Sequence, residues 1–346
     1  MKAVVKLAPG EGNIEVQDVP IPQIKPDEVL VAVKGTGLCG TDSLLYQWTY
    51  RGRAPVPTPI VLGHEAAGEI AEVGAQVKNV KVGDRVALDA LIGCGKCYYC
   101  RHGLIFLCRD WDHLGISFDG TFAEYVAIPA CAVRTLPDDV SWEDAAFLEI
   151  LAVVAHTMER IKICGGDNVV IIGPGPLGLF HLQAVRAAGA GQTIVVGTDG
   201  DDARLAVATK VGADHVLDES KVDAVEAILD LTGGVGADVV IEAGGTPSAV
   251  ATAFEVVRGG AQMAFLGFAK QAEFVPLNAV RNSLNVQFVL SGLGRHVEQS
   301  IRWIQAGQVL GSRIITHRIP LDEADYGFRE MLERRAVKVY FNMEER

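Results

Sequence analysis

The chain has 346 residues, 49% of them hydrophobic and 21% charged, a globular balance with room for two domains. Its 43 acidic and 31 basic residues give a net charge of −12, which argues against nucleic acid as a partner because a phosphate backbone would be repelled. No run approaches the roughly 18 apolar residues that cross a bilayer, and Pro9 and Gly10 interrupt the N-terminal segment, so we expect a soluble, cytoplasmic protein.

The first 145 residues or so have the pattern of a β-rich domain. Short runs of Val, Ile and Ala, punctuated by Gly and Pro, are typical of strands separated by turns. Four such runs occur in order: "VLVAVKGTG", "VLGHEAAGEIAEVG", "GDRVALDALIG" and "GTFAEYVAIP".

Around residue 165 the pattern changes to strands that alternate with helices. Six apolar strand candidates, most of them separated by helix-length segments, predict a parallel sheet covered on both faces. After Gly294 come a helical segment, an amphipathic stretch and the strand "VKVYF", which do not extend this alternation. We expect an α/β protein with a β-rich domain over residues 1–152, a doubly wound parallel-sheet domain over 153–290, and a segment, 291–346, that returns in part to the first domain.

Four of the seven cysteines lie in the fifteen-residue segment "CGKCYYCRHGLIFLC". A reducing cytosol favours metal-bound thiolates over disulfides, and four sulfurs form the closed arrangement of a structural zinc site, here in a lobe over residues 93–109. The predicted ligands are Cys94, Cys97, Cys100 and Cys108. The alternatives are an iron–sulfur cluster, unligated thiols and a zinc-ribbon contact with DNA, although the surroundings are not basic. The isolated Cys131 and Cys164 are expected to be packing residues.

A second, open metal site is predicted from two glycine-rich segments 25 residues apart. "GTGLCGTD" contains Cys39, and "VLGHEAAGE" contains His64 and Glu65. A thiolate, an imidazole and a carboxylate fill three positions of a tetrahedral zinc ion and leave the fourth for water or substrate. Glu149 stands in the apolar run "AAFLEILAVVAHTM", where a buried carboxylate needs a cation or a hydrogen-bond donor, so it is a candidate fourth or exchangeable ligand. The alternatives are that Cys39 and His64 only pack and that Glu149 only begins a helix.

A phosphate-binding loop is predicted in "VVIIGPGPLG", which follows an apolar strand and precedes a helix. Its GxGxxG pattern consists of Gly173, Gly175 and Gly178, and Pro176 and Leu177 lie at the start of the helix. Glycines let the backbone approach a pyrophosphate, whose charge is stabilised by free N–H groups at the helix N-terminus.

An acidic residue ends the next strand, 21 residues beyond the last glycine of the loop. Asp199 at this position would accept hydrogen bonds from the adenosine ribose and repel a 2′-phosphate, and Asp201 and Asp202 would add to that repulsion. We therefore expect NAD rather than NADP. Arg204 is expected on a solvated helix face, with stacking on the adenine as the alternative.

Six segments of the sequence resemble, in their order, the motifs of the zinc-dependent medium-chain dehydrogenases, which include alcohol, sorbitol and threonine dehydrogenases. They are "GLCGTD", "GHEAAGE", "GDRV", the four-cysteine lobe, "GPGPLG" and "VGAD". The similarity extends over nearly the whole chain. It implies a GroES-like catalytic domain interrupted by a Rossmann domain, with one catalytic and one structural zinc per chain. It also implies a homo-oligomer, either a dimer or a tetramer.

The resemblance also implies roles for individual residues. Cys39 and His64 would bind the catalytic zinc together with Glu65 or Glu149. Asp42 would orient His64, and Thr41 would be the hydroxyl that first takes the substrate proton. Arg295 resembles a cofactor contact of the threonine dehydrogenase branch.

The sequence also departs from the family pattern at three positions. Leu44 replaces a histidine that passes the proton to solvent in many members, so the proton must leave by another route, such as the cofactor ribose and water. Leu91 stands where threonine dehydrogenases usually have a histidine, which weakens the case for an amino-acid substrate. Glu149 is closer to the polyol branch, although Ile150 replaces the usual proline.

The resemblance therefore implies reversible oxidation of a secondary alcohol or polyol, with hydride transfer to NAD in a cleft between the two domains. The alternatives are oxidation of an amino alcohol, as in L-threonine 3-dehydrogenase, a zinc-free reductase of double bonds from the same superfamily, and an NAD-binding relative without activity. The intact set of Cys39, His64 and Glu65 argues against the zinc-free reductase.

Overall fold

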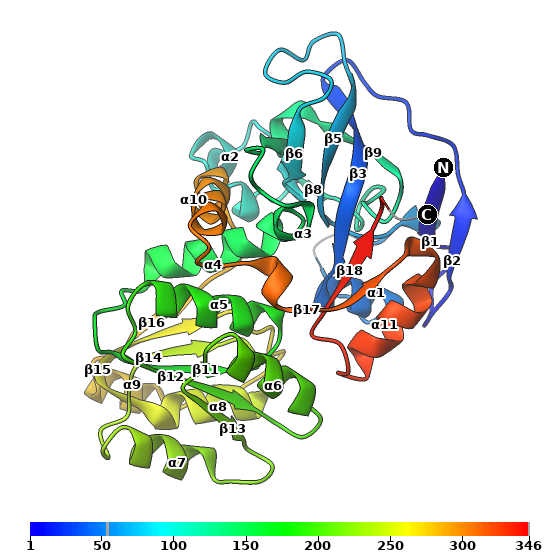
Figure 1. The fold of residues 1–346 in the computed structure, drawn as a ribbon. Helices are drawn as coiled ribbons and strands as arrows, with labels where there is room; N and C mark the ends of the chain where they lie inside the picture. The colour runs from blue at the N-terminus through cyan, green and yellow to red at the C-terminus, as the bar shows by residue number, and fades with distance from the viewer. Residues whose placement is uncertain (53–54, 345–346) are drawn as a thin grey trace. The chain divides into compact units, whose positions relative to one another are not determined.

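The computed structural model describes residues 1–52 and 55–344, and the chain divides into two compact units (Figure 1). The first unit comprises Met1–Ala152, Gly292–Gln305 and Ile315–Arg346, and the second comprises Val153–Ser291 and Ala306–Ile314. Among the described residues, no helix combines the length and the apolar character that a membrane crossing requires.

The first unit is built on a mixed sheet in the strand order β10-β6-β5-β3-β18-β17, with β9 also paired to β3. The strands are β3 (Glu28–Leu38), β5 (Glu65–Val73), β6 (Arg85–Leu88), β9 (Tyr125–Pro129), β10 (Val133–Thr135), β17 (Ile315–Ile319) and β18 (Lys338–Asn342). The long strand β3 pairs antiparallel with β5, β9 and β18, so the last strand of the chain lies beside one of the first. The C-terminal segment therefore completes the sheet that the N-terminal segment begins.

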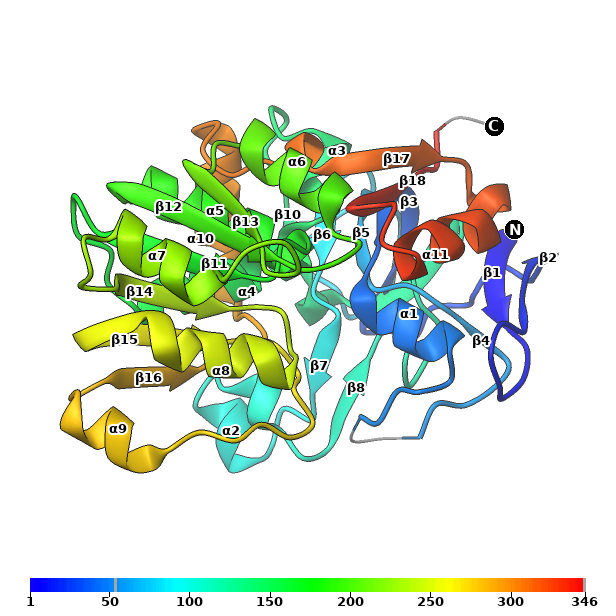
Figure 2. The same cartoon turned by 90° about the horizontal axis from the view of Figure 1, so that it is seen from below.

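Two smaller sheets and several helices surround this sheet. The sheets are β2-β1-β4, formed by β1 (Lys2–Lys6), β2 (Ile14–Asp18) and β4 (Ile60–Val61), and the ribbon of β7 (Leu91–Gly93) with β8 (Trp111–His113). The helices are α1 (Gly40–Tyr46), α2 (Tyr98–Arg101), α3 (Trp142–Ala145), α4 (Leu148–Arg160), α10 (Gly294–Gln305) and α11 (Ala324–Leu332), and the 3-10 turns are η1 (Ile105–Leu107), η2 (Ala130–Ala132) and η4 (Leu321–Glu323). Helix α4 continues into the second unit. Tyr46 of α1 stacks on Phe328 of α11 with ring centroids 5.0 Å apart, and the two helices lie side by side in Figures 1 and 2.

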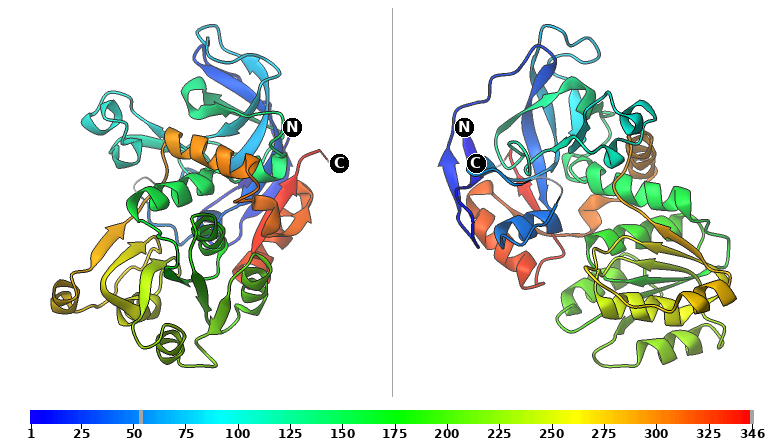
Figure 3. Two further views of the ribbon diagram at one scale, coloured as in Figure 1. Left: turned by 60° about the vertical axis from the view of Figure 1, so that its left-hand side comes forward. Right: turned by 180° about the vertical axis from the view of Figure 1, so that it is seen from behind.

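The second unit is described in full and contains one parallel sheet in the order β13-β12-β11-β14-β15-β16. Its strands are β11 (Asn168–Ile172), β12 (Gln192–Gly197), β13 (His215–Asp218), β14 (Ala237–Glu242), β15 (Val257–Phe265) and β16 (Asn285–Phe288). They alternate with α5 (Pro176–Ala187), α6 (Asp202–Lys210), α7 (Ala224–Leu231), α8 (Pro247–Val256) and α9 (Pro276–Arg281), and η3 (Gly311–Arg313) follows later in the chain. Helices cover both faces of the sheet, with α5 on one side and α7 and α8 on the other (Figures 1 and 3).

The strand pattern predicted for residues 165–290 is confirmed, because each of the six apolar runs forms one strand of this sheet. The central strand β11 is buried over four of its five residues, as expected for a parallel strand that has helices on both faces. The reversal of strand order lies between β11 and β14, which is where open α/β sheets bind ligands. An α/β protein with a doubly wound sheet is the observed fold class.

The expectation that Cys131 and Cys164 are packing residues is wrong, because both are exposed. Cys131 lies in the turn η2 between two strands, and Cys164 lies in the loop before β11. Connecting segments run over the surface, and so a side chain on them is solvated even when its type is usually buried.

Candidate metal centres and dinucleotide loop

Strand pairing brings together the two glycine-rich segments that carry the predicted open metal site. β3 runs antiparallel to β5, and Gly37 near the end of β3 is opposite Glu65 at the start of β5. Cys39 follows β3 as the N-cap of α1, and His64 directly precedes β5. The antiparallel pairing of β3 with β5 therefore brings Cys39 close to His64, although they are 25 residues apart in the sequence.

Cys39, His64 and Glu65 form one potential metal-binding group, with one ligand atom of each within 4.8 Å of the others. His64 and Glu65 are fully buried. Among the described residues, the Nδ1 of His64 and the Oε2 of Glu65 make no hydrogen bond, and their only polar contacts are the ion pairs with Asp42 and Lys338 described below. A thiolate, an imidazole and a carboxylate are also the donors that Zn²⁺ prefers, so the residues fit a zinc ion.

Asp42 lies behind His64 on α1. Its Oδ2 accepts a hydrogen bond from the backbone N–H of Cys39 at 2.9 Å, and its Oδ1 is 3.3 Å from Nδ1 of His64, an ion-pair distance without hydrogen-bond alignment. Burial by itself would lower the pKa of His64, but the charges of Asp42 and Cys39 raise it well above its usual value. The Asp42 contact engages Nδ1 and leaves Nε2 as the nitrogen that can face an ion, an orientation that carboxylates commonly impose on metal-binding histidines.

Glu65 also has a partner that the sequence analysis missed. The Nζ of Lys338 lies 2.8 Å from Oε1 and 2.6 Å from Oε2 of Glu65, and it donates a third contact to the carbonyl of Leu38 at 3.0 Å. The two side chains are 1% and 0% exposed. The lysine also lies 5.1 Å from the centre of the Phe147 ring. Glu65 is thus charge-balanced without a metal ion, and any ion at the group shares this carboxylate with the ammonium.

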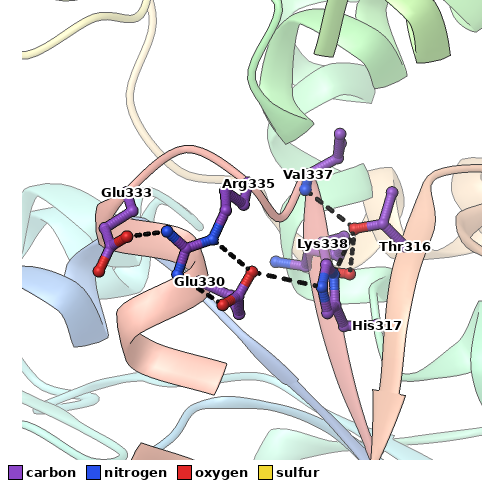
Figure 4. A network of polar contacts seen from close by, with 7 residues as sticks. All are labelled: Thr316, His317, Glu330, Glu333, Arg335, Val337 and Lys338. Carbon is purple, nitrogen blue, oxygen red and sulfur yellow. Dashed lines mark hydrogen bonds and ion pairs between the residues drawn. The ribbon is translucent and has the colours of Figure 1, made fainter. Parts of the chain in front are cut away.

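A polar network holds the start of β18, which carries Lys338 (Figure 4). Thr316 on β17 accepts a hydrogen bond from the backbone N–H of Val337 at 3.0 Å and donates to the carbonyl of Lys338 at 3.4 Å. Just before the strand, Arg335 binds Glu330 of α11 through Nε and Nη2 at 2.9 and 2.7 Å. These contacts fix the backbone from which the lysine reaches Glu65.

Glu149 and Thr41 lie in the same unit but outside the group. The pKa of Glu149 is raised to about 7, chiefly by burial; Glu65 also raises it, while His64 and Lys338 lower it. The charges of the site therefore influence the pKa of Glu149, although Glu149 is not part of the metal-binding group of Cys39, His64 and Glu65. Thr41 is half-buried on the first turn of α1, and its hydroxyl makes no hydrogen bond to any residue that the structure describes. Leu44, at the position where many family members have a proton-carrying histidine, is exposed.

The four cysteines of the lobe form the second group, with their sulfurs within 4.8 Å of one another. The Sγ atoms of Cys97 and Cys108 are 3.8 Å apart, which excludes a disulfide between them. Tetrahedral zinc with Zn–S bonds of about 2.3 Å requires sulfurs about 3.8 Å apart, so this spacing fits the ion. Hydrogen bonds from the backbone N–H groups of Lys96 and Cys97 lower the pKa of Cys94 to about 7, which favours the thiolate that a metal needs.

The glycine loop has the backbone that a bound pyrophosphate requires. Gly173 has a φ of +104°, and a Cβ there would lie 2.6 Å from the nitrogen of Gly244, in the loop after β14. A Cβ at Gly178 would lie 2.0 Å from the carbonyl oxygen of Gly173, so only glycine lets α5 begin this close to the loop. Gly175 is the N-cap of α5 and has open space where its Cβ would be, with Pro176 and Leu177 in the first turn. The free N–H groups at this helix end can bind an anion.

A buried carboxylate holds the neighbouring loop. Glu242 ends β14, and its Oε1 accepts hydrogen bonds from the backbone of Gly244 at 2.9 Å and Gly245 at 2.6 Å. Burial raises the pKa of Glu242, and the loop N–H groups lower it. Because β11 and β14 are neighbours, the loops that follow them meet at the point where the strand order reverses.

The remaining predicted cofactor residues are divided between the two units. Asp199 is exposed just beyond the end of β12. Arg204 does not lie free on a solvated face, because it is largely buried and its Nη1 lies 3.2 Å from Oδ1 of Asp201. Arg295 is exposed on α10, which belongs to the first unit, whereas the glycine loop belongs to the second.

Lys338, His113 and Glu242 were not predicted as site residues. Lys338 and Glu242 had a visible signal, since Lys338 is the one charge in the apolar strand "VKVYF" and Glu242 follows the apolar run of "DVVIE". His113 ends the short strand β8, and its ring centroid is 5.2 Å from that of His64. Burial lowers the pKa of His113 to about 4, and the nearby His64 lowers it too. Nothing in the sequence around it indicated this position.

The chain is similar to known protein families and solved structures. Residues 25–138 match the family described as "Alcohol dehydrogenase GroES-like domain", and residues 176–306 match "Zinc-binding dehydrogenase". The chain is 36% identical over 325 residues to sorbitol dehydrogenase of Bacillus subtilis (strain 168), and the alignment covers 93% of this chain and 91% of that protein. It is 35% identical over 344 residues to L-threonine 3-dehydrogenase of Rhizobium etli (strain CIAT 652), and the alignment covers 98% of this chain and 97% of that protein. A solved zinc-binding dehydrogenase from Sinorhizobium meliloti 1021, bound to NADP, has a TM-score of 0.88 and 32% identity and covers 99% of this chain and 98% of that one.

Proposed function

The chain belongs to the zinc-dependent medium-chain dehydrogenases, and from that premise we propose that it catalyses the reversible, NAD-linked oxidation of a secondary alcohol or polyol to a ketone. The observation that carries the proposal is the convergence of Cys39, His64 and Glu65. Three protein donors leave one position of a tetrahedral ion open for a substrate oxygen, which suits a catalytic zinc rather than a structural one. Glu149 remains a proposed exchangeable ligand. The four cysteines of the lobe are proposed to hold a second zinc that stabilises the fold.

The chain's own residues bind and orient the reactants. When bound, zinc would supply a Lewis acid that favours an ionised hydroxyl, and NAD would supply the hydride acceptor. Asp42 lies 3.3 Å from Nδ1 of His64 and would favour the ring orientation in which Nε2 faces the ion. The hydroxyl of Thr41 has no partner among the described residues and can therefore accept the substrate proton. Leu44 has no group that could pass this proton on, so the ribose of a bound cofactor, together with water, would have to supply the route beyond Thr41.

The relatives leave the substrate class open between polyols and amino alcohols. Sorbitol dehydrogenase and L-threonine 3-dehydrogenase are almost equally similar to this chain. Leu91, in place of the histidine that threonine dehydrogenases usually have, supports a polyol or simple secondary alcohol. The second candidate is oxidation of an amino alcohol, and the third is a binding protein without activity.

The experiment that tests the proposal is an assay of secondary alcohols, polyols, sugar phosphates and L-threonine with NAD, followed by NADH absorbance. We expect turnover of at least one alcohol or polyol and a zinc content near two per chain. Cys39→Ala should abolish turnover and lose one zinc while the protein stays folded, and Cys131→Ala, which removes an exposed thiol, is the matched control. Binding of NADH without turnover of any compound would support a binding protein instead.

We also propose that NAD is preferred over NADP. Asp199 is exposed beyond the end of β12, the position that contacts the adenosine ribose in dinucleotide-binding sheets. Arg204, the nearby cation that could pair with a 2′-phosphate, is already paired with Asp201. Because the Sinorhizobium meliloti protein binds NADP, the preference for NAD over NADP is tested directly below.

An exposed apolar surface supports self-association through the second unit. β16 is an edge strand of its sheet, and Phe288 on it is 79% exposed. The neighbouring segment adds further exposed apolar side chains, which are Phe268, Phe274, Val275, Leu277 and Val280. An unpaired, apolar sheet edge is a site for pairing with another chain. We propose that two copies associate through this edge.

A further inference from the structure

His113 is placed beside the open metal group by the short ribbon of β7 and β8. In this ribbon His113 pairs with Leu91, and Trp111 pairs with Gly93. Side chains alternate along a strand, so Trp111 and His113 share one face, while Asp112 between them is exposed on the other. The His113 ring stands edge-on to the rings of His64 and Trp111, with centroids 5.2 and 5.6 Å away.

The contacts of His113 fix its orientation and its tautomer. Nδ1 lies 2.8 Å from the carbonyl oxygen of Leu114, which can only accept a hydrogen bond, so Nδ1 carries the proton. The neutral ring then has an acceptor at Nε2, to which no residue in ranges 1–52 and 55–344 donates a hydrogen bond. Backbone contacts with Ser117 at 2.8 and 3.0 Å hold the end of the strand. His113 is also absent from the metal-binding group itself.

We propose that His113 determines substrate specificity by accepting, through Nε2, a hydrogen bond from a second hydroxyl group next to the carbon that is oxidised. The inference rests on the proposed function and narrows it from any secondary alcohol to a vicinal diol or polyol. The ring is in edge contact with the imidazole of a predicted zinc ligand, so a molecule held at the ion also lies near His113. A site built to accept a hydrogen bond discriminates strongly against a substrate that lacks the donor, because the acceptor is then left unpaired.

The test compares matched pairs of substrates that differ by one hydroxyl, butane-2,3-diol with butan-2-ol and propane-1,2-diol with propan-2-ol. His113→Phe keeps an aromatic ring against His64 and removes the acceptor, whereas His113→Gln keeps an acceptor. We expect His113→Phe to lower kcat/KM for the diols about 10- to 100-fold and to change that for the mono-ols by less than about 3-fold. His113→Gln should recover part of the loss for the diols alone. Both variants should retain two zinc ions per chain.

A second measurement does not depend on turnover. In the zinc-loaded protein without cofactor, the diols should raise the unfolding temperature more than the mono-ols, and His113→Phe should abolish this difference. An equal loss of activity on diols and mono-ols in His113→Phe, or no loss on either, would overturn the inference while leaving the dehydrogenase proposal intact. Failure of the unaltered protein to oxidise every alcohol in the wider panel would overturn the dehydrogenase proposal, and this inference with it.

Discussion

Lys338 and Glu65 form a buried ion pair across 273 residues of sequence, with Nζ 2.6 and 2.8 Å from the two carboxylate oxygens. Removing one partner of such a pair leaves an uncompensated buried charge, at a cost of about 3–5 kcal/mol. In zinc-depleted protein, Lys338→Met should lower the free energy of unfolding by this amount. The double variant Glu65→Gln with Lys338→Met should lose less, because neither charge is then left alone.

Urea unfolding of the four proteins in this cycle measures the coupling of the pair. Bound zinc should reduce the cost of Lys338→Met, since the ion can then balance the Glu65 charge. A double variant that loses as much as the sum of the two single variants would show that the pair does not stabilise the fold.

The cysteine lobe provides a test of the structural zinc with an internal control. Cys97→Ala should reduce the zinc content from about two to about one per chain and lower the unfolding temperature, because the remaining thiolates crowd one another without an ion between them. Cys131→Ala removes an exposed thiol and should change neither quantity. Zinc content is measured by atomic emission and stability by calorimetry. Two zinc ions retained by Cys97→Ala would contradict the assignment.

The cofactor preference should depend on Asp199. Asp199→Ser removes a negative charge at the end of β12 and should improve kcat/KM for NADP relative to NAD by about 10-fold or more. Asp202→Ser is the matched control, since Asp202 is exposed three residues away and its charge is balanced by Lys221 at 2.9 Å. Steady-state kinetics with both cofactors gives the two ratios. If the ratio of kcat/KM for NADP to that for NAD is the same in Asp199→Ser and in the unaltered protein, this carboxylate does not determine the cofactor preference.

Stability in acid should depend on His181, which is fully buried on α5 with Nδ1 2.7 Å from the carbonyl of Leu177. The pKa of His181 is lowered to about 4, chiefly by burial, while the hydrogen bond with Leu177 raises it. Above pH 6.5 neither the folded nor the unfolded state binds a proton at this residue. Between pH 6.5 and about 4 only the unfolded state does, so the free energy of unfolding falls with decreasing pH by up to about 1.4 kcal/mol per unit.

His181→Gln should remove this part of the pH dependence, which is measured as the unfolding temperature between pH 4 and 7. His102→Gln is the control, because exposed His102 makes the same i to i−4 contact, with the carbonyl of Tyr98 at 2.7 Å. Identical pH profiles for His181→Gln and the unaltered protein would rule out the proposed contribution.

The assembly should depend on the β16 edge. Phe288→Lys places a charge on the exposed apolar strand and should shift the protein toward a smaller assembly in sedimentation analysis. Val235→Lys makes the same change at a position that is 64% exposed in a loop, and should leave the assembly unchanged. An unaltered protein that sediments as a monomer would refute association through this surface.

The sequence predicted those parts of the molecule that depend on local pattern. The six strands of the second unit follow from apolar runs between helices, and the convergence of Cys39 with His64 follows from glycine-rich segments at the ends of two paired strands. The cysteine cluster follows from spacing alone, because short loops bring the sulfurs together at little entropic cost.

The rest depends on pairings that no local pattern encodes. Lys338 reaches Glu65 only because β18 pairs with β3, and His113 reaches His64 only because β8 returns beside β7 after the cysteine lobe. The prediction that Cys131 and Cys164 are buried was wrong for a similar reason. The residue type indicates only an average environment, and here each cysteine lies on an exposed connecting segment.

The discontinuity of the first unit constrains the order in which the chain can fold during synthesis. β3 and β5 emerge early, but β18 leaves the ribosome only after the whole second unit, and until then Glu65 lacks its Lys338 partner and β3 lacks one neighbouring strand. The second unit lies within the sequence and is nearly complete by Ser291, so it can fold first. A nascent chain arrested shortly before residue 338 should therefore protect the second unit from protease and leave the first exposed to cleavage.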